Sequence, residues 1–420
     1  MYPREGQLLA ALTAFLLSAT PLFTVRHERP LGITAARSAG DSTTLVILGV
    51  DHSAQLVASA YHPGYFRAFF ERVRPAAICV ERSPEEFARG DYYEFTYEVQ
   101  HIAVPYARAH GIDLWPIDWL PSKDDEQLAF GRLEVVDPPI IRPASDFQSF
   151  VTMDSSALSH TLAIGESEAA RRQTQTFFEA PRAPGTRDFP RRLDLYRTFM
   201  QAMRIRTALR AHAGKTVLVV VGAMHKEDIE FVLARTPGLR IVQPSSYGFP
   251  AATDAMARLE RGDLAAILSF NLLGIQSEGG AVDRAWVDQV FDLFKATQPP
   301  TPEIALLQTR HDVLTHRLAA AAAAAAYERL ATSGDTAATF TFTGVEDTRR
   351  VDSYYDPFGN LKVRQRAMIE AAREWVRAGQ PERARRIQDQ LITSRRWSAL
   401  QRAELAVYWD RYIMRDPHSS

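Results

Sequence analysis

Two short motifs with the pattern Gly-x-x-His carry the residues of this sequence that are best suited to chemistry. GVDH places Gly49 three residues before His52, and GAMH places Gly222 three residues before His225. Fewer than one such motif is expected by chance from 22 glycines and 11 histidines in 420 residues. Each motif ends an apolar run, where a glycine lets the backbone turn out of a sheet and lets a ligand approach closely. We therefore expect both histidines at strand ends, facing a substrate or an ion.

Acidic side chains follow two further strand-like runs. Glu81 follows AAICV, and Asp118 ends IDLWPID. Ligands and catalytic groups in α/β folds collect at the carboxyl ends of parallel strands, so these carboxylates should lie beside the histidines. A charge directly after an apolar strand is costly unless it is paired or functional, which favours Glu81 in particular. Asp51 is a candidate for an additional ligand or for a residue that orients His52.

Two histidines with one or two carboxylates are a suitable ligand set for a divalent metal ion such as Mn, Co, Fe or Zn. Such an ion could activate water for hydrolysis, with a spare carboxylate as the general base. The same residues could also act without a metal, because a histidine can take a proton from water directly. The residues alone leave both mechanisms open.

The segments that must position these residues alternate between strand-like and helix-like patterns. Short β-branched runs such as 43–50 and 76–81 are separated by amphipathic stretches, and a long helical stretch at about 191–213 precedes the run at 216–222. This alternation predicts an α/β fold (layered, α+β-like) with a mixed sheet and flanking helices. Beyond residue 250 the sequence becomes helical with turn signals between helices, so we expect an all-helical C-terminal region.

We predict three parts along the chain, and the first concerns export. The stretch LLAALTAFLLSATPLF has the length of a signal-peptide core and is shorter than the ~20 residues that span a bilayer. We expect an exported protein, periplasmic or secreted, in which this stretch is cleaved or kept as a membrane anchor; a buried N-terminal helix is the alternative. The predicted parts are a signal peptide or anchor with its leader (1–42), an α/β domain with an irregular insertion at 121–190 (43–249) and a helical C-terminal domain (250–420).

Composition excludes nucleic-acid binding and limits the chemistry of the single cysteine. The 49 lysines and arginines are balanced by 50 aspartates and glutamates, giving a net charge of −1, so no positive surplus exists to bind a phosphate backbone. We expect no nucleic-acid partner. The single cysteine, Cys79, cannot form an intramolecular disulfide, and its apolar neighbours predict a buried structural thiol.

On these motifs the chain resembles the TraB/PrgY/GumN group, which includes the Tiki proteases, within the superfamily of erythromycin-esterase-like and ChaN-like proteins. The resemblance covers roughly residues 43–245. It rests on the two Gly-x-x-His motifs and on Val80-Glu81 after the second strand. Three further residues match the family pattern in helices or at a strand end: Glu98, Asp118 and Arg197.

The resemblance implies several activities on one scaffold. Tiki-like members imply a metal-dependent peptidase with the histidines and the glutamate in the site, esterase-like relatives imply hydrolysis based on a histidine, and ChaN-like relatives imply haem binding. In our interpretation Glu98 and Asp118 orient the site, and Arg197 holds a substrate carboxylate or an oxyanion; a structural ion pair is the alternative for Glu98 and Arg197.

We therefore expect an exported, metal-dependent hydrolase that cleaves peptide or ester bonds of a peptide or small-molecule substrate. Two alternatives remain open. One is a protein that binds haem or another small ligand. The other is a non-catalytic interaction protein whose helical C-terminal region binds a protein partner. Function varies on such scaffolds, so the fold alone does not fix the reaction.

Overall fold

The structure is a computed structural model of the chain. It describes residues 42–414, except 91, 93–94, 123–124, 126–149, 151, 180–187, 333–336 and 345–348. Residues Ser42–Ser420 form one compact unit. The predicted signal peptide or anchor lies, except for Ser42, outside the described residues.

Five parallel strands form a single sheet. Every described strand pair is parallel, so the sheet is more regular than the mixed sheet that we expected, and the α/β class with flanking helices is confirmed. The register sets Gly49 opposite Val221 and Cys79 opposite Val219. The strands, in the spatial order β3-β2-β4-β1-β5, are β1 (Thr43–Val50), β2 (Ala77–Val80), β3 (Asp113–Pro116), β4 (Thr216–Gly222) and β5 (Leu239–Val242).

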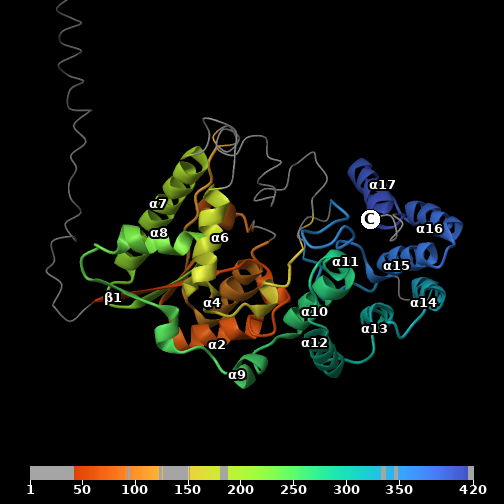
Figure 1. Cartoon of the computed structure of the whole chain (residues 1–420), viewed down its shortest axis with the longest axis horizontal. Coiled ribbons are helices and arrows are strands. Elements are labelled where there is room, and N and C mark those ends of the chain that lie inside the picture. The colour runs from red at the N-terminus through yellow and green to blue at the C-terminus, as the bar shows by residue number, and fades with distance from the viewer. Residues whose placement is uncertain are drawn as a thin grey trace, which may run out of the picture. The chain divides into compact units, whose positions relative to one another are not determined.

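Both faces of the sheet are covered, which explains why its central strands are continuously apolar. Along β1, Val46 and Leu48 belong to the core on one face, while Leu45 and Ile47 belong to a second core on the other face. Figure 1 shows the two helical layers on either side of β1. The helices α2 (Pro63–Val73) and α4 (Val104–His110) pack on the first core, and α7 (Asp188–Ala211) and α8 (Ala223–Leu233) pack on the second.

A π-helix, η4 (Glu98–Ala103), leads into α4 and begins at a predicted site residue. Pro105 has no N–H, so the helical hydrogen-bond ladder is interrupted there. The carbonyl oxygen of His101 instead accepts a hydrogen bond from Nη2 of Arg67, at 3.3 Å. π-Helical turns are rare in proteins as a whole, and many of those that occur lie at functional sites.

Part of the predicted insertion folds against the sheet. Its described elements are η6 (Ala157–Ser159), η7 (Ile164–Glu166) and α6 (Glu168–Glu179). A Cβ atom on Gly49 would lie 3.1 Å from the Cα atoms of both Gly165 and Ala223. The first Gly-x-x-His glycine therefore allows η7 and the start of α8 to pack closely over β1, which is a structural reason for that glycine.

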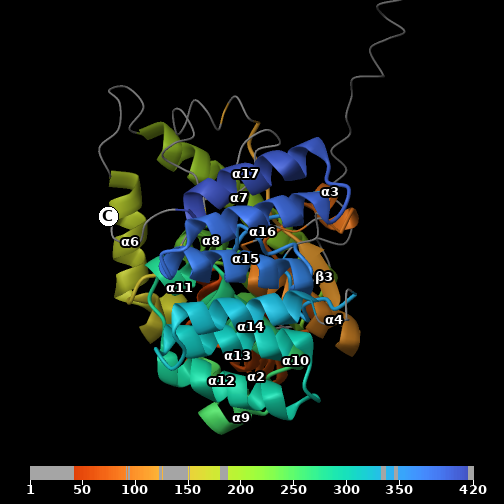
Figure 2. The same cartoon turned by 90° about the vertical axis from the view of Figure 1, so that its right-hand side faces the viewer.

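The C-terminal region is helical, as expected, and Figure 2 shows α13, α14, α15 and α16 side by side. One hydrophobic core extends from Val46 to Ile413, so it includes residues on both sides of the predicted boundary at 249/250. The remaining elements are η3 (Ala54–Leu56), α3 (Pro84–Ala88), η8 (Pro244–Tyr247), α9 (Ala252–Met256), α10 (Arg261–Leu268), the π-helix η9 (Ser269–Leu273), α11 (Gln276–Gly279), α12 (Arg284–Ala296), α13 (Pro302–Leu314), α14 (Ala320–Thr332), α15 (Val363–Arg377), α16 (Pro381–Thr393) and α17 (Ala399–Tyr412).

Buried arginines satisfy the carbonyl groups that η9 leaves at its C-terminal end. Nε of Arg310 donates to the carbonyl oxygen of Leu272 at 2.9 Å, and Nη2 of Arg366 donates to that of Leu273 at 2.5 Å. Arg366 also pairs with Glu370 at 2.7 Å. Unpaired buried carbonyl groups are costly, so these arginines stabilise the junction between the α/β part and the helical region.

Cys79 is buried, as predicted, and burial raises the pKa of its thiol well above the ordinary value. Within the part of the chain that the structure describes, no helix is both long enough and apolar enough to cross a membrane.

Candidate functional site

The predicted site residues converge at the carboxyl edge of the sheet. His52 follows β1 and Glu81 follows β2, while His225 lies in the first turn of α8, directly after β4. Nε2 of His52 lies 3.6 Å from one carboxylate oxygen of Glu81, and Nε2 of His225 lies 3.5 Å from the other. Two imidazoles from distant parts of the sequence thus face one carboxylate.

Glu81 is the centre of this arrangement and is almost fully buried. Its Oε2 accepts a hydrogen bond from the backbone N–H of Gly222 at 2.6 Å, and its Oε1 accepts one from Arg197 at 2.9 Å. Burial by itself raises the pKa of this carboxyl, but His225, His52 and Arg197 together hold the pKa well below its usual range. Glu81 is therefore an ionised acceptor.

The second Gly-x-x-His glycine is needed because the site is tightly packed around it. A Cβ atom on Gly222 would lie 2.9 Å from Nε2 of His52 and 3.4 Å from Oε2 of Glu81. Any side chain there would displace the imidazole. This differs from Gly49, whose missing side chain makes room for backbone.

His52 forms an ion pair with Glu98 through Nδ1, the ring nitrogen that does not face Glu81. Its Nδ1 lies 2.7 Å from Oε1 of Glu98, and Gln55 donates to Oε2 of the same carboxylate at 3.1 Å. Burial disfavours the imidazolium, but the carboxylates of Glu98, Glu81 and Asp51 outweigh this effect and raise the pKa of His52 to about 9. The side chain of His52 is 23% exposed, so it is more open to solvent than Glu81 and His225, which are buried.

Ser53, directly after His52, has a backbone conformation that is unusual for a serine. Its φ angle is +64°, in the left-handed region, although it is buried. Its hydroxyl donates to the carbonyl oxygen of Phe95 at 2.7 Å. Residues held in such conformations cost of order 1–3 kcal/mol and cluster at active sites, where the surrounding structure imposes them.

Arg197 joins two of the predicted carboxylates. It donates from Nε and Nη2 to the two oxygens of Asp118, each at 2.8 Å, in the bidentate geometry that suits a guanidinium. Gln201 donates to the same aspartate at 2.8 Å. The guanidinium also binds Glu81, so in this arrangement Arg197 fixes protein carboxylates, and Asp118 acts on the site through it.

His225 is buried and is oriented by α7. Its Nδ1 lies 2.9 Å from Oγ1 of Thr198 and 3.6 Å from Oδ1 of Asp194. Burial raises the pKa of Asp194. The Nε2 atom of His225, which faces Glu81, makes no hydrogen bond to any residue that the structure describes.

Asp51 has its own ion-pair partner outside this carboxylate cluster. Its carboxylate lies 3.0 Å from Nδ1 of His160, which comes from the insertion, and its backbone N–H donates to the hydroxyl of Tyr61 at 3.1 Å. Asp51 influences His52 through its charge, and its own partner is a histidine that the sequence analysis did not single out.

Several residues that orient the site were not predicted from the sequence. On α7, three polar residues occur at the spacing i, i+4 and i+7, which places them on one face of the helix, and this spacing was a usable signal. The remaining residues carry no local signal, because long-range packing brings them to the site. The residues missed are Asp194, Thr198 and Gln201 on α7, together with Gln55, Ser53 and His160.

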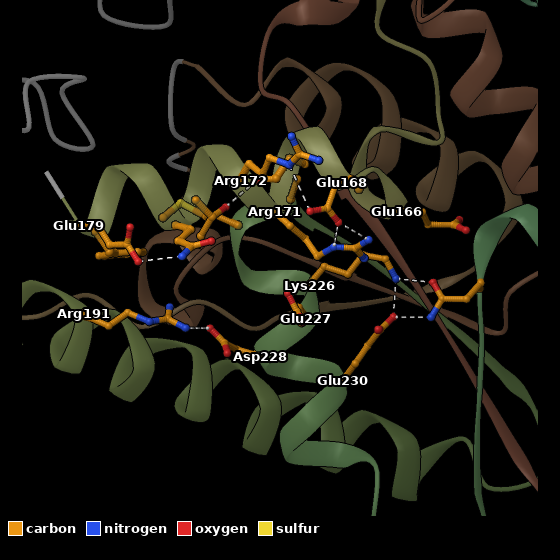
Figure 3. A pocket seen from close by; sticks show the side chains of 18 of the residues that line it. Glu166, Glu168, Arg171, Arg172, Glu179, Arg191, Lys226, Glu227, Asp228 and Glu230 are labelled. Atoms are coloured by element: carbon orange, nitrogen blue, oxygen red, sulfur yellow. Dashed lines mark hydrogen bonds and ion pairs between the residues drawn. The ribbon is translucent and has the colours of Figure 1, made fainter.

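A separate cavity, of about 1020 Å³, lies between α6, the start of α7 and α8 (Figure 3). Its charged side chains pair mostly with one another: Arg191 binds Asp228, and Lys226 binds Glu230 and Gln243. None of the predicted site residues is among the described residues that line it. Helix α8 connects the two places, since Lys226 lines the cavity and His225 faces the carboxylate site.

The residues of the carboxylate site were predicted to form a metal centre. Among the residues that the structure describes, no group of three histidine, cysteine, aspartate or glutamate side chains is arranged to hold a metal ion. The carboxylate between the two imidazoles already accepts from Gly222 and Arg197. As arranged, the side chains form a hydrogen-bonded ion-pair cluster.

Comparison with known proteins gives no family for this chain. No protein-family profile, no curated protein and no solved structure matches it. The function therefore has to be argued from the site itself.

Proposed function

We propose that this protein is an exported hydrolase of the TraB/Tiki-like class that cleaves peptide or ester bonds at the carboxyl edge of its sheet. One observation carries the proposal: Nε2 atoms of His52 and His225 face the two oxygens of one ionised carboxylate, Glu81. Each imidazole is oriented through its Nδ1 by a second group. This is the arrangement in which histidines transfer protons efficiently.

The two histidines are suited to different proton transfers. His52, with a pKa raised to about 9, is an imidazolium at neutral pH and can donate a proton to a leaving group or stabilise developing negative charge. We assign the second proton transfer, from the attacking water, to His225, whose Nε2 atom faces Glu81 and makes no hydrogen bond among the described residues. A division of acid and base roles between two groups is typical of acid–base catalysis.

A divalent metal does not fit the side chains in the arrangement described, so the proposed proton transfers use the protein's own groups. Metal content remains directly measurable. Elemental analysis of the purified protein, and of a His52→Ala, His225→Ala double variant, gives the test. A divalent ion present in equimolar amount in the wild type and lost in the variant would establish the metal-dependent version of the hydrolase.

The hydrolase proposal is tested with a panel of peptide and ester substrates, whose products are identified by mass spectrometry. We expect His52→Gln and His225→Gln each to lower the rate by about 10²–10⁴-fold, which is the usual contribution of a general acid or base. His110→Gln is the matched control, because His110 is an exposed histidine at the end of α4. Its Nδ1 lies 2.8 Å from the carbonyl oxygen of Tyr106, and its ring stacks on that of Tyr106 with centroids 4.1 Å apart. Full activity in both site variants, or no cleavage of any substrate, would contradict the proposal.

A further inference from the structure

We infer that the helical region beyond residue 250 is a positioning part of the His52–Glu98 site, acting through Tyr355 and Asp263. The inference rests on the proposed function for its catalytic meaning, and it deepens that function by naming residues that hold the site. In this role the C-terminal region supports the site, which differs from the role of an independent domain that docks a partner. Three separate contacts carry it.

The first contact reaches the residue after His52. The hydroxyl oxygens of Tyr355 and Ser53 are 3.2 Å apart, and both side chains are buried. Ser53 has one hydroxyl proton, which it donates to the carbonyl oxygen of Phe95, so the proton between the two hydroxyls comes from Tyr355. The chain of hydrogen bonds from Tyr355 through Ser53 to Phe95 ties together the two segments that carry His52 and Glu98.

Aromatic packing reinforces this tie. The ring of Phe95 meets the His52 imidazole edge to face, with centroids 5.1 Å apart. Phe95 also contacts the ring of Tyr354, with centroids 5.9 Å apart. The tyrosine pair before α15 therefore limits the movement of Phe95, and Phe95 limits the rotation of the imidazole.

The second contact reaches the residue before Glu98. The hydroxyl of Tyr97 donates to Oδ1 of Asp263 at 2.8 Å, and Asp263 is itself buried in an ion pair with Arg67. Asp263 lies on α10, in the C-terminal region. It fixes the start of the π-helix η4, and with it the carboxylate that holds Nδ1 of His52.

The third contact holds η3, the short turn after Ser53. Nδ2 of Asn271 donates to the carbonyl oxygen of Leu56 at 2.7 Å and to that of Ile267 at 2.8 Å. A single 3₁₀ turn and a π turn have little intrinsic stability. Ser53 adds a strained backbone. The geometry of the His52–Glu98 pair consequently depends on groups supplied from beyond residue 250.

The inference is tested by following the Nδ1 proton of His52 by proton NMR on the full chain. A proton in a 2.7 Å hydrogen bond to a buried carboxylate gives a resolved low-field signal, which is assigned by its loss in His52→Gln. We expect Tyr355→Phe and Tyr97→Phe to shift or abolish this signal. Each variant removes one hydroxyl and keeps the ring.

Tyr327→Phe is the matched control. Tyr327 is a buried tyrosine of α14, and its hydroxyl has no hydrogen-bond partner among the described residues. This variant should leave the signal unchanged, and all three variants should keep the far-UV circular dichroism of the wild type. A signal that is absent in the wild type, unchanged in both test variants, or altered equally by the control would overturn the inference.

The NMR measurement separates this inference from the hydrolase proposal. The signal reports the His52–Glu98 geometry whether or not any bond is cleaved. If hydrolysis is found, Tyr355→Phe should lower kcat at least tenfold more than it raises KM, because a displaced acid acts on the chemical step. If no hydrolysis is found but the signal responds as expected, the positioning role stands and the reaction is wrong.

Discussion

At the scale of single residues, the site is a chain of alternating charges. Glu98, His52, Glu81, Arg197 and Asp118 follow one another as acid, base, acid, base and acid, each within 3.6 Å of the next. Buried charges are costly unless they are paired, and this alternation leaves each one compensated. The order explains why His52 is held as an imidazolium and Glu81 as a carboxylate.

Gly222→Ala is the sharpest test of this packing. The new Cβ would lie 2.9 Å from Nε2 of His52, so the imidazole must move by several tenths of an ångström or more. Misplacement by about 1 Å can cost about 10²-fold in rate, so we expect a loss of that order in any hydrolytic activity, measured as kcat/KM.

The control for Gly222→Ala is Gly262→Ala. Gly262 lies in α10, and nothing lies within 4 Å of the Cβ that alanine would add. Alanine is favoured over glycine in a helix by roughly 0.5–1 kcal/mol, so this variant should keep its activity and melt at the same or a higher temperature. Equal activity in the two variants would show that the space around Gly222 does not matter.

At the scale of elements, helix α2 illustrates how a histidine can be structural. His62 is the N-cap of α2, where its Nδ1 accepts a hydrogen bond from the N–H of Gly64 at 3.2 Å, and its ring stacks on Trp286 at 5.1 Å. Burial and the nearby Arg67 lower the pKa of His62 to about 4. A protonated ring could not accept this hydrogen bond, so the cap requires the neutral form.

This cap predicts a pH dependence of stability. Between about pH 6.5 and pH 4 the unfolded chain binds a proton at His62 and the folded chain does not, so the stability from the neutral form is complete above pH 6.5 and is lost as the pH falls towards 4. The free energy of unfolding should fall by about 3 kcal/mol over this range because of His62. In His62→Asn, which keeps a capping acceptor without a titratable ring, urea unfolding should depend less on pH over this range. Parallel stability curves for wild type and variant would contradict this assignment.

The buried ion pairs of α15 give a second prediction at this scale. Arg366→Ala removes the partner of Glu370 and Asp356 and the donor to the carbonyl of Leu273. Breaking a buried pair from one side costs about 3–5 kcal/mol, so thermal unfolding should show a large loss of stability. Arg385→Ala is the control, because its pair with Glu382 is exposed, and its melting temperature should not change measurably.

The elements also show what the sequence could and could not predict. Strands such as 43–50 and 216–222 were predictable from their continuous apolar pattern, but the sheet is parallel in every described strand pair, whereas we expected a mixed sheet. Because parallel strands share one carboxyl edge, the meeting of His52, Glu81 and His225 followed as well. The π-helix at Glu98 was not predictable, since it depends on Pro105 and on contacts from distant residues.

The same limit applies to the residues that orient the site. Tyr355 lies 302 positions from Ser53, so no local pattern could pair them. Arg197 was expected to hold substrate, with a structural ion pair as the alternative, and sequence alone could not show that Asp118 and Glu81 both occupy it. Partner choice between buried charges is decided by packing, and packing is a property of the folded chain.

At the scale of the whole molecule, the shared core predicts that the α/β part and the helical region unfold together. One cluster of buried apolar residues includes Val46 of β1, Phe66 of α2, Phe270 of η9 and Trp375 of α15. Separating the two parts would expose this cluster, at a cost of about 25 cal/mol for each Å² of apolar surface. Neither part is then expected to remain folded when the other unfolds.

Hydrogen exchange during urea titration measures this coupling. Amide protons of β1 and β4 should become exposed at the same urea concentration, and with the same dependence on urea, as those of α14 and α15, because a single transition exposes both. Helix α6 is an internal contrast: none of its residues is buried, so its amides should exchange at lower urea concentration through local opening. If the amides of α14 and α15 stayed protected after those of β1 and β4 had exchanged, the helical region would be an independent folding unit. Its hydroxyl and carboxylate contacts to the His52 segment would then be interdomain contacts, and the site would lose them whenever the two units separate.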